Sequence, residues 1–552
     1  MTTLVIRYRV HSENLAGQAF SPRDMQALSL GALVAEKAPE PFVDAHIAAT
    51  GGTLAQALYL SGLVLPPALC SGLGRCGLCR VRFISEAPEP LAVEHEVLSH
   101  HDLDAGWRLA CQHRPEEGMH VLVPAIGMRD ALEKAILCER GNASKGQPLA
   151  LAVDLGTTSI HWQGVTPNGA TVPGGMTTNP QMGAGSDVIS RIACAQVPEG
   201  ATALRRLALE VLASLARTGR YSEGCLAANP AMAAIFLGHD VSGLARAPYR
   251  RDYAGGVTEH VEGLFPIWIP PQVSPFIGGD LSAGYAAIAF AGDSSGPEYP
   301  FLLADLGTNG ECILALDEQI SFAASIPMGP ALEGINLTYG SDARPGAVTA
   351  YSLTPCGLEP QVMGGGSANG ITATGYLSLL RALRAAGILD ENGLFIGAGG
   401  HTDGAALLRR RTEGAGRIKK TSIRLPGKMF LTAWDVEEIL KVKAAFTLAV
   451  SRLLTAASLP ISRLKGVYLA GSLGTYAPLD ALYALGFLPP GLGAPVHLSG
   501  NTSLAGARLF LADHAARDKS IDWARRVTTL DLASDPAFGS AYAEHMVFAW
   551  RV

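Results

Sequence analysis

Residues 151–160 read LAVDLGTTSI, and residues 302–311 read LLADLGTNGE. Asp154 in the first stretch and Asp305 in the second are separated by 305 − 154 = 151 residues. In each stretch an apolar run ends in an aspartate and continues into a glycine turn with polar residues. Short apolar runs bounded by turn residues are typical of buried strands. A repeat at this domain-sized spacing predicts two related α/β halves.

The two aspartate–glycine turns are predicted to bind a nucleotide. A turn after a strand directs backbone amides toward a phosphate, and the carboxylate can hold Mg2+ through water. We therefore expect two phosphate loops that clamp ATP, with Asp154 and Asp305 as catalytic residues that position Mg2+ and water. A third turn, AGSLG at 470–474, is expected to approach the adenosine, because small residues let the backbone come close. The expected ATP-binding residues are Gly156, Thr157, Thr158, Gly307, Thr308, Asn309, Gly310, Gly471, Ser472 and Gly474.

Other polar residues of this region are weaker candidates. Asp280 and Glu311 suit a nucleotide site, but they equally suit surface or capping carboxylates. Lys443 is expected to be a solvated lysine, with a position near the adenosine as the alternative. The whole pattern also has a simpler interpretation, in which the three turns are ordinary glycine turns between buried strands.

Two helices are predicted around these turns. In residues 203–216 the apolar side chains recur on one helical face, as in an amphipathic helix. Residues 432–452 begin with Thr432-x-x-Asp435, a capping pair, and are predicted to continue as a long helix. A third strand and turn follow at 466–476.

Four of the nine cysteines are grouped by spacing. They follow the pattern Cys70-x5-Cys76-x2-Cys79, then 31 residues, then Cys111. Thiolates are soft ligands that suit iron–sulfur clusters or zinc. Structural zinc usually takes two short Cys-x2-4-Cys pairs, and only one such pair is present. We therefore expect these four residues to bind a [2Fe–2S] cluster, with zinc or free core thiols as alternatives.

The remaining cysteines are scattered through the chain. They are expected to be packing residues, since a free cysteine behaves as a small apolar side chain. An odd total argues against a disulfide framework. The five residues are Cys138, Cys194, Cys225, Cys312 and Cys356.

The cysteine loop resembles a plant-type or adrenodoxin-type ferredoxin. The resemblance rests on CSGLGRCGLCR at 70–80 and WRLACQ at 107–112, and it covers about residues 1–125. Ferredoxins carry single electrons, at roughly −400 mV for the plant type. Two-residue periodicity with one helix predicts a small mixed sheet here. The predicted elements are strands at 3–10, 80–84 and 120–124 and a helix at 53–63.

The order of the three glycine turns resembles the acetate kinase, Hsp70 and actin superfamily. Further motifs resemble one subfamily, the reductive activators of corrinoid proteins, which join a ferredoxin domain to this ATPase fold. These motifs are NPQMGAGSDVISRI (179–192), SPFIGGD (274–280), LADLGTNGE (303–311), GPALEGI (329–335), LAGSLGTY (469–476) and GNTSLAGA (500–507). The turns at 228–232 and 370–375 depart from the family pattern.

The resemblance implies ATP-dependent reductive activation of a corrinoid protein of a methyltransferase system. One electron would pass from the [2Fe–2S] cluster to cobalt(II) and restore cobalt(I). The resemblance also implies an upstream electron donor and a homodimer. The alternatives are an ATP-driven electron donor to another low-potential enzyme and a nucleotide-binding redox sensor.

The composition is that of a globular protein. Hydrophobic residues make up 48% and charged residues 17% of the 552 residues, which excludes a disordered chain. The formal net charge is 43 − 49 = −6, so a nucleic acid is not an expected partner. No long apolar run predicts a membrane span, no signal peptide is apparent, and we expect a cytoplasmic protein.

The predicted organisation is multidomain. A β-grasp [2Fe–2S] ferredoxin domain of the α+β class is expected at 1–128, followed by a linker at 129–148. A duplicated ribonuclease H-like α/β ATPase of the actin-like fold is expected at 149–552, with halves at roughly 149–300 and 301–552. The sequence explains neither the segment 11–45 nor the basic stretch 409–428, for which docking to an acidic partner and an exposed hairpin are both open.

Overall fold

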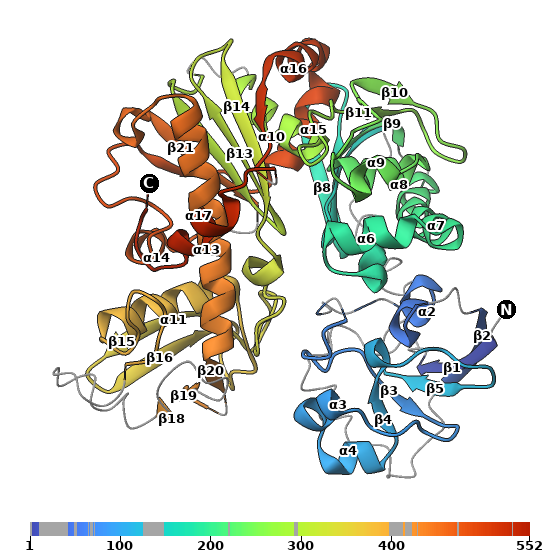
Figure 1. Ribbon diagram of the computed structural model, residues 1–552. Helices are drawn as coiled ribbons and strands as arrows, with labels where there is room; N and C mark the ends of the chain where they lie inside the picture. The colour runs from blue at the N-terminus through green and yellow to red at the C-terminus, as the bar shows by residue number, and fades with distance from the viewer. Residues whose placement is uncertain are drawn as a thin grey trace. The chain divides into compact units, whose positions relative to one another are not determined.

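The computed structural model divides into two compact units. Unit 1 comprises residues 1–283 and 503–521, and unit 2 comprises residues 284–502 and 522–552. Figure 1 labels the helices and strands of both units. The structure describes residues 3–9, 42–48, 52–64, 66, 70, 72–124, 148–218, 221–291, 296–396, 412–413, 422–427, 429–471, 474–532 and 534–551. Most of the segment 11–45, the predicted linker and the stretch 409–428 therefore lie outside the described residues, as does Cys138.

The N-terminal part of unit 1 is a mixed five-stranded sheet. Its strands are β1 (Thr3–Arg9), β2 (Phe42–Ala48), β3 (Arg80–Phe83), β4 (Trp107–Leu109) and β5 (His120–Val123), in the order β2-β1-β5-β3-β4. β1 runs parallel to β5, and the other neighbours are antiparallel. Helix α2 (Leu54–Leu60) shares the core with this sheet. The β-grasp prediction is confirmed, while β2, β4 and the short helices α3 (Ala92–Val97) and α4 (His100–Asp104) were not predicted.

Helix α2 begins where the sequence predicts. Thr53 and Gln56 form a reciprocal capping box, in which each side chain accepts a hydrogen bond from the other residue's backbone N–H. Such a box satisfies two amides that the first helical turn leaves without partners. The helix ends before Gly62, whose φ of +80° is a left-handed conformation that favours glycine.

The second part of unit 1 is built on a six-stranded sheet. Its order is β10-β11-β9-β6-β7-β8. The strands are β6 (Leu149–Leu155), β7 (Ser159–Val165), β8 (Thr171–Thr178), β9 (Tyr221–Ala228), β10 (Val257–Glu259) and β11 (Ile267–Ile269). The helical elements are η2 (Pro180–Ala184), α6 (Val188–Ala195), α7 (Pro198–Ala216), α8 (Pro230–Leu237), α9 (Ser242–Ala245), α10 (Gly279–Ala289), α15 (Thr502–Ala512) and α16 (His514–Arg526). Of these, α10 and α16 continue into unit 2, and the first residue of α15 belongs to it.

Unit 2 contains a second six-stranded sheet, in the order β22-β21-β12-β13-β14-β23. Its strands are β12 (Phe301–Leu306), β13 (Asn309–Ala315), β14 (Ser321–Pro327), β21 (Gly466–Gly471), β22 (Val496–Leu498) and β23 (Thr528–Leu530). Two small sheets are formed by β15 (Ala347–Thr354), β16 (Gly357–Val362) and β17 (Gly370–Ile371), and by β18 (Thr412–Glu413), β19 (Ser422–Arg424) and β20 (Phe430–Thr432). The helical elements are η3 (Pro330–Glu333), α11 (Ala373–Ala385), α13 (Ala433–Ala456), η4 (Ile461–Arg463), α14 (Leu479–Ala484) and α17 (Phe538–His545).

The two six-stranded sheets repeat one arrangement. In unit 1, β6, β7 and β8 form an antiparallel meander, and β6 pairs in parallel with β9. In unit 2, β12, β13 and β14 form the same meander, and β12 pairs in parallel with β21. The sequence repeat therefore marks a structural duplication, which confirms the prediction of a duplicated α/β fold.

Helices α7 and α13 confirm the sequence patterns. The apolar side chains predicted on one face of α7 are all buried, namely Leu204, Leu207, Ala208, Val211, Leu212 and Leu215. Thr432 and Asp435 form the predicted capping box of α13, which packs against β13 and β14 and is the long orange helix of Figure 1.

The solvated interpretation of Lys443 is wrong. Its side chain is fully buried in α13. Its Nζ donates hydrogen bonds to the backbone carbonyls of Ala549 and, at 3.2 Å, of His545. Burial lowers the pKa of Lys443 to about 8. This lysine anchors the end of the chain to α13.

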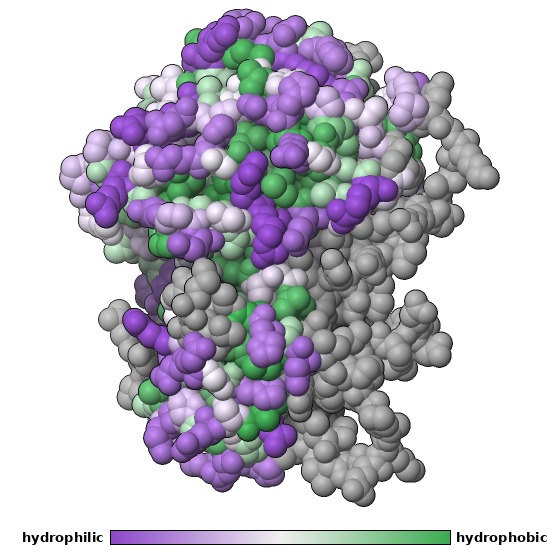
Figure 2. All heavy atoms as spheres, turned by 90° about the vertical axis from the view of Figure 1, so that its right-hand side faces the viewer, coloured by the Kyte–Doolittle hydropathy of each residue, from purple (hydrophilic) through white to green (hydrophobic). Residues whose placement is uncertain are grey.

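Within the described residues, no helix combines the length and apolar character that crossing a membrane requires. On the face displayed in Figure 2, hydrophilic and hydrophobic residues are intermixed.

Candidate functional site

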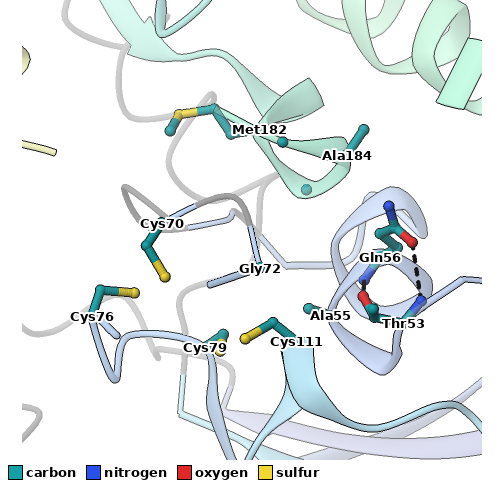
Figure 3. A pocket seen from close by; sticks show the side chains of 12 residues that line it. Thr53, Ala55, Gln56, Cys70, Gly72, Cys76, Cys79, Cys111, Met182 and Ala184 are labelled. Carbon is teal, nitrogen blue, oxygen red and sulfur yellow. Dashed lines mark hydrogen bonds between the residues drawn. The ribbon is translucent and has the colours of Figure 1, made fainter. Parts of the chain in front are cut away.

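The four grouped cysteines line one cavity in unit 1. Cys70, Cys76 and Cys79 come from the loop before β3, and Cys111 comes from the short 3-10 helix η1 (Ala110–Gln112) after β4. Their side chains surround a common space (Figure 3) in a cavity of ≈ 100 Å³. Cys70 and Cys79 are buried, whereas Cys76 and Cys111 are partly exposed. The loop and η1 thus bring together all four residues that the spacing singled out.

The thiols of the cavity interact in two pairs. A hydrogen bond between the Cys70 and Cys76 side chains lowers the pKa of Cys70 to about 5 and raises that of Cys76. The corresponding bond between Cys79 and Cys111 raises the pKa of Cys79 and lowers that of Cys111. Among the described residues, no group of three or more His, Cys, Asp or Glu side chains has a geometry for one metal ion. Two thiol pairs are the donor set that a two-iron cluster requires, because each iron takes two cysteine ligands.

Glycines allow the cysteine loop to curl around this space. Gly72, Gly74 and Gly77 have φ values of +85°, +71° and +67°, a region in which a side chain is strained. Gln112 closes the loop, because its Nε2 donates to the carbonyl of Gly72 at 2.7 Å and contacts Sγ of Cys111 at 3.2 Å. Hydrogen bonds to cysteine sulfur are among the factors that set the potential of an iron–sulfur cluster.

A buried carboxylate holds the segment that carries Cys111. Glu94 is fully buried. Its Oε1 accepts a hydrogen bond from the Leu109 amide at 2.6 Å and lies 3.0 Å from Nε2 of His113. Its other oxygen accepts from the Leu91 amide at 2.8 Å. Glu94 therefore holds the chain on both sides of Cys111, through the Leu109 amide and the His113 ring, a role that the sequence did not indicate.

The first predicted phosphate loop is the turn between β6 and β7. Asn179 and Arg191 both bind its backbone. Nδ2 of Asn179 donates to the carbonyl of Gly156 at 2.7 Å, and the Arg191 guanidinium donates to the carbonyl of Thr157. Nδ2 of Asn229 donates to Oγ1 of Thr157 at 3.2 Å. These three supporting side chains are buried, so the turn is a rigid element.

Asp154 lies at the end of β6, beside Asp280 at the start of α10. Asp154 is buried. Burial, with the nearby charge of Asp154, raises the pKa of Asp280 to about 7. The second-tier candidate Asp280 thus lies close to the predicted catalytic residue in unit 1.

The second predicted phosphate loop is the turn between β12 and β13 in unit 2. Oγ1 of Thr308 donates to both carboxylate oxygens of Glu333, at 3.1 and 3.0 Å. Gly471, with φ +76°, lies against Asp305, and a Cβ there would come within 2.4 Å of Oδ1 of Asp305. The third glycine turn therefore contacts the second predicted catalytic residue.

The remaining predicted ATP-binding residues that the structure describes lie in the glycine turns or at the start of β13. Thr158 lies in the first turn, and Asn309 and Gly310 begin β13. A Cβ at Gly310 would come within 2.1 Å of Sδ of Met328, so a side chain there would displace Met328. A Cβ at Gly474 would come within 2.7 Å of the Gly500 carbonyl. Ser472 lies outside the described residues.

Sequence reasoning missed Asn179, Arg191 and Glu333 as site residues. All three lie in motifs that carried the family resemblance, at 179–192 and 329–335, so a signal was present. Glu311 is buried and is the strand partner of Asp305 in the β12–β13 hairpin. Cys225 and Cys312 are buried and Cys194 is partly buried, as packing predicts, but Cys356 is exposed and that prediction is wrong. It lies in the turn between β15 and β16, where no core is available.

Several known proteins are similar to this chain. The corrinoid activation enzyme RamQ of Eubacterium limosum is 26% identical over 460 residues, which cover 79% of this chain and 75% of that protein. A Co(II) methylated amine-specific corrinoid protein reductase of Methanosarcina barkeri is 25% identical over 379 residues, 61% of this chain and 64% of that protein. The solved structure of a reductive activator for corrinoid, iron–sulfur protein has a TM-score of 0.63 at 21% identity and covers 91% of this chain and 97% of its own.

Family models match most of the chain. The 2Fe-2S iron–sulfur cluster binding domain matches residues 43–116, the RACo middle region matches 149–292, and the C-terminal domain of RACo, the ASKHA domain, matches 300–551. Fold and site thus define an iron–sulfur protein joined to an ASKHA-type nucleotide-binding domain. The chain belongs to the family of reductive activators of corrinoid proteins.

Proposed function

We propose that this protein uses ATP to reduce cobalt(II) to cobalt(I) in a corrinoid protein of a methyltransferase system. The observation that carries the proposal is the presence, in one chain, of a four-thiol cavity and of two copies of an aspartate–glycine turn. Neither feature alone suffices, because a ferredoxin needs no nucleotide and an ATPase needs no thiol cavity.

The four thiols of the cavity fit a [2Fe–2S] cluster. Cys70 and Cys76 would hold one iron, and Cys79 and Cys111 the other, because these are the pairs within hydrogen-bonding reach. When bound, the cluster supplies a single electron at low potential. The chain itself contributes the curled loop, the sulfur contact from Gln112 and the anchoring of Cys111 through Glu94.

The two turns would hold ATP and Mg2+. Asp154 and Asp305 each end the first strand of a meander, where a carboxylate can hold Mg2+ through water and orient the attacking water. Backbone amides of the two turns and of the Gly471 turn would contact the phosphates and the nucleoside. Glu333 fixes the Thr308 hydroxyl, and the Asn179–Arg191 support fixes the first turn.

ATP is required because cobalt(II) is difficult to reduce. An electron donor alone leaves the unfavourable equilibrium unchanged. A nucleotide can shift that equilibrium only if it binds more tightly to one conformation of the complex than to another. Binding and hydrolysis of ATP would favour the complex in which cobalt is easier to reduce and then release the product.

The proposal includes an external low-potential one-electron donor, which restores the reduced state after each turnover. It also includes a homodimer, a cytoplasmic location and the domain boundaries 1–128, 129–148 and 149–552.

The function is tested by following the cobalt(II) absorption of a corrinoid protein on addition of ATP and a reductant. The wild-type protein is expected to remove the cobalt(II) signal only when both are present. Cys76→Ala is expected to abolish reduction and leave ATP binding intact, and Cys356→Ala, at the exposed cysteine, is the matched control. Asp305→Ala is expected to keep the visible spectrum and lose ATP hydrolysis, with the exposed Glu359→Ala as its control.

Three outcomes contradict the proposal. Full cobalt reduction by Asp305→Ala would show that ATP turnover is not coupled to reduction. ATP hydrolysis without cobalt reduction would favour an electron donor to another low-potential enzyme. Nucleotide binding with no hydrolysis, with or without a corrinoid protein, would favour a redox sensor.

A further inference from the structure

Residues 179–185, which comprise Asn179, η2 and Gly185, contact both functional parts of unit 1. We call them the 179–185 segment. The segment follows β8 and precedes α6. One side of it supports the first phosphate turn, and the other side lines the cysteine cavity.

On the phosphate side, the segment is joined to the turn by buried hydrogen bonds. Nδ2 of Asn179 donates to the carbonyl of Gly156, and the backbone amide of Asn179 donates to the carbonyl of Thr158 at 2.8 Å. The Arg191 guanidinium donates to Thr157, to the carbonyl of Gly185 at 3.2 Å and to Oε1 of Gln181 at 3.3 Å. Arg191 thus bonds to the turn and to the segment at once, and it is fully buried.

On the other side, the segment packs on the ferredoxin part. Met182, Gly183, Ala184 and Gly185 line the cavity opposite the cysteines (Figure 3). η2 packs against α2 so closely that a Cβ at Gly183 would come within 2.4 Å of Cβ of Tyr59.

Arg206 in α7 strengthens the contact between the two parts. Its Nη2 donates to the carbonyls of Leu60, at 2.8 Å, and of Ser61, at 3.1 Å. These carbonyls lie at the C-terminal end of α2, where helical carbonyls have no intrahelical partner and cations bind favourably.

We propose that the 179–185 segment couples the nucleotide state of the first phosphate turn to the cysteine cavity, with Asn179 and Arg191 as positioning residues. The inference rests on the proposed function and adds the path by which the two sites communicate. A buried and fully hydrogen-bonded network moves as a unit, so a displacement of the turn displaces η2 against α2 and the cavity. Because coupling between two binding equilibria is reciprocal, the redox state must alter nucleotide affinity by the same factor.

The test measures the coupling from both ends in cluster-loaded, full-length protein. The midpoint potential is titrated with and without a non-hydrolysable ATP analogue plus Mg2+. The Kd of the same analogue is measured for the oxidised and the reduced protein. We expect about a fivefold difference in Kd, which corresponds to about 40 mV for a one-electron couple.

Two variants loosen the contact without altering the cysteines or the phosphate turn. Gly183→Ala forces η2 away from Tyr59, and Arg206→Gln removes the bonds to Leu60 and Ser61. Arg206 is half exposed, so this variant keeps the test decisive if Gly183→Ala does not fold. Both are expected to retain the visible spectrum and nucleotide binding but to lose the potential shift and the redox dependence of Kd.

Arg205→Gln is the matched control, because Arg205 lies beside Arg206 in α7 and donates instead to the carbonyl of Phe236. It is expected to keep the full coupling. An undiminished potential shift in Gly183→Ala or Arg206→Gln overturns the inference, as does a wild-type protein whose potential ignores nucleotide. If either occurs while the wild type still reduces cobalt(II) only with ATP, the proposed function stands and the communication path alone is wrong.

Discussion

The two copies of the β-meander share a turn sequence and a strand order but differ in the segment that follows the third strand. β8 is followed by η2 and β14 by η3, and the two 3-10 helices start 330 − 180 = 150 residues apart, each on a proline. In the first copy a neutral amide, Asn179, reaches back to the turn. In the second copy a carboxylate, Glu333, does so.

This difference shows how the two copies of a duplicated fold can support the same turn with different side chains. The shared sheet fixes the place of each aspartate and each turn. The segment after the third strand then decides what supports the turn: a buried amide and guanidinium in unit 1, and a carboxylate bonded to Thr308 in unit 2. The first copy is thereby attached to the ferredoxin part, while the second presents additional negative charge beside its turn.

The largest expected effect comes from Arg191→Met, which removes the support of the first copy. Three buried acceptors, on Thr157, Gln181 and Gly185, would lose the hydrogen bond from Arg191, and Oε1 of Gln181 would keep only its 3.4 Å bond from Nδ2 of Asn179. An unsatisfied buried polar group costs about 1–3 kcal/mol. Carbonyl oxygens are the least costly of these groups to leave unsatisfied, so we expect the free energy of unfolding to fall by about 3 kcal/mol. Urea unfolding measures it. Arg205→Met, which loses one carbonyl contact, should change the free energy of unfolding far less, and equal losses would show that Arg191 has no special role.

Gly471→Ala tests the support of the second copy. The positive φ and the nearby Asp305 carboxylate both oppose a side chain at this position. A left-handed conformation of a non-glycine residue costs on the order of 2 kcal/mol, and displacement of Asp305 should also reduce ATP hydrolysis. Gly539→Ala is the control, because its added methyl group meets open space in α17. Hydrolysis at the wild-type rate in Gly471→Ala would separate Asp305 from catalysis.

Thr308→Val and Thr157→Val compare the two turns directly. Each removes a hydroxyl that hydrogen-bonds to a neighbouring side chain, Glu333 for Thr308 and Asn229 for Thr157, so each should cost about 1 kcal/mol of stability. Only Thr308→Val is expected to reduce the rate of ATP hydrolysis markedly, because it releases a carboxylate. Thr308→Ser, which retains the hydroxyl, should restore that rate. A similar reduction by both valine variants would mean that the two turns act alike.

The smallest expected effect is a loss of stability around His545 in unit 2 as the pH falls. Burial lowers the pKa of His545 to about 4, and its Nδ1 lies 2.8 Å from Oγ1 of Thr447. The unfolded chain then binds more protons between pH 6.5 and 4, so stability is lost as the pH falls through this range. Hydrogen exchange in α17 should accelerate from pH 6.5 to 4.5, after correction for intrinsic rates. Absence of this acceleration would show that His545 does not resist protonation.

Local patterns in the sequence predicted much of the fold. Thr53 and Thr432 begin helices as predicted, because capping depends on residues within one turn. The buried face of α7 follows from periodicity alone. The cysteine spacing predicted a set of side chains that do line one cavity.

Other features depend on residues far apart in the chain. Lys443 looked like a solvated residue, yet it binds carbonyls about a hundred positions away. Glu94 reaches His113 and Leu109 across the loop that carries Cys111. Cys356 was expected to be a packing residue because cysteine usually is one, but it lies in an exposed turn. No local pattern contains such information.

The sequence by itself determined the chemistry of this protein: four thiols with ferredoxin spacing, two aspartate–glycine turns and the order in which they occur. The tertiary structure alone decided how these parts are connected. With Arg191, the 179–185 segment supports the first predicted phosphate turn, and it also lines the cysteine cavity, only because η2 packs against α2. The physical reason is that donor atoms and turns are encoded residue by residue, whereas buried hydrogen bonds between distant segments exist only once the core has packed.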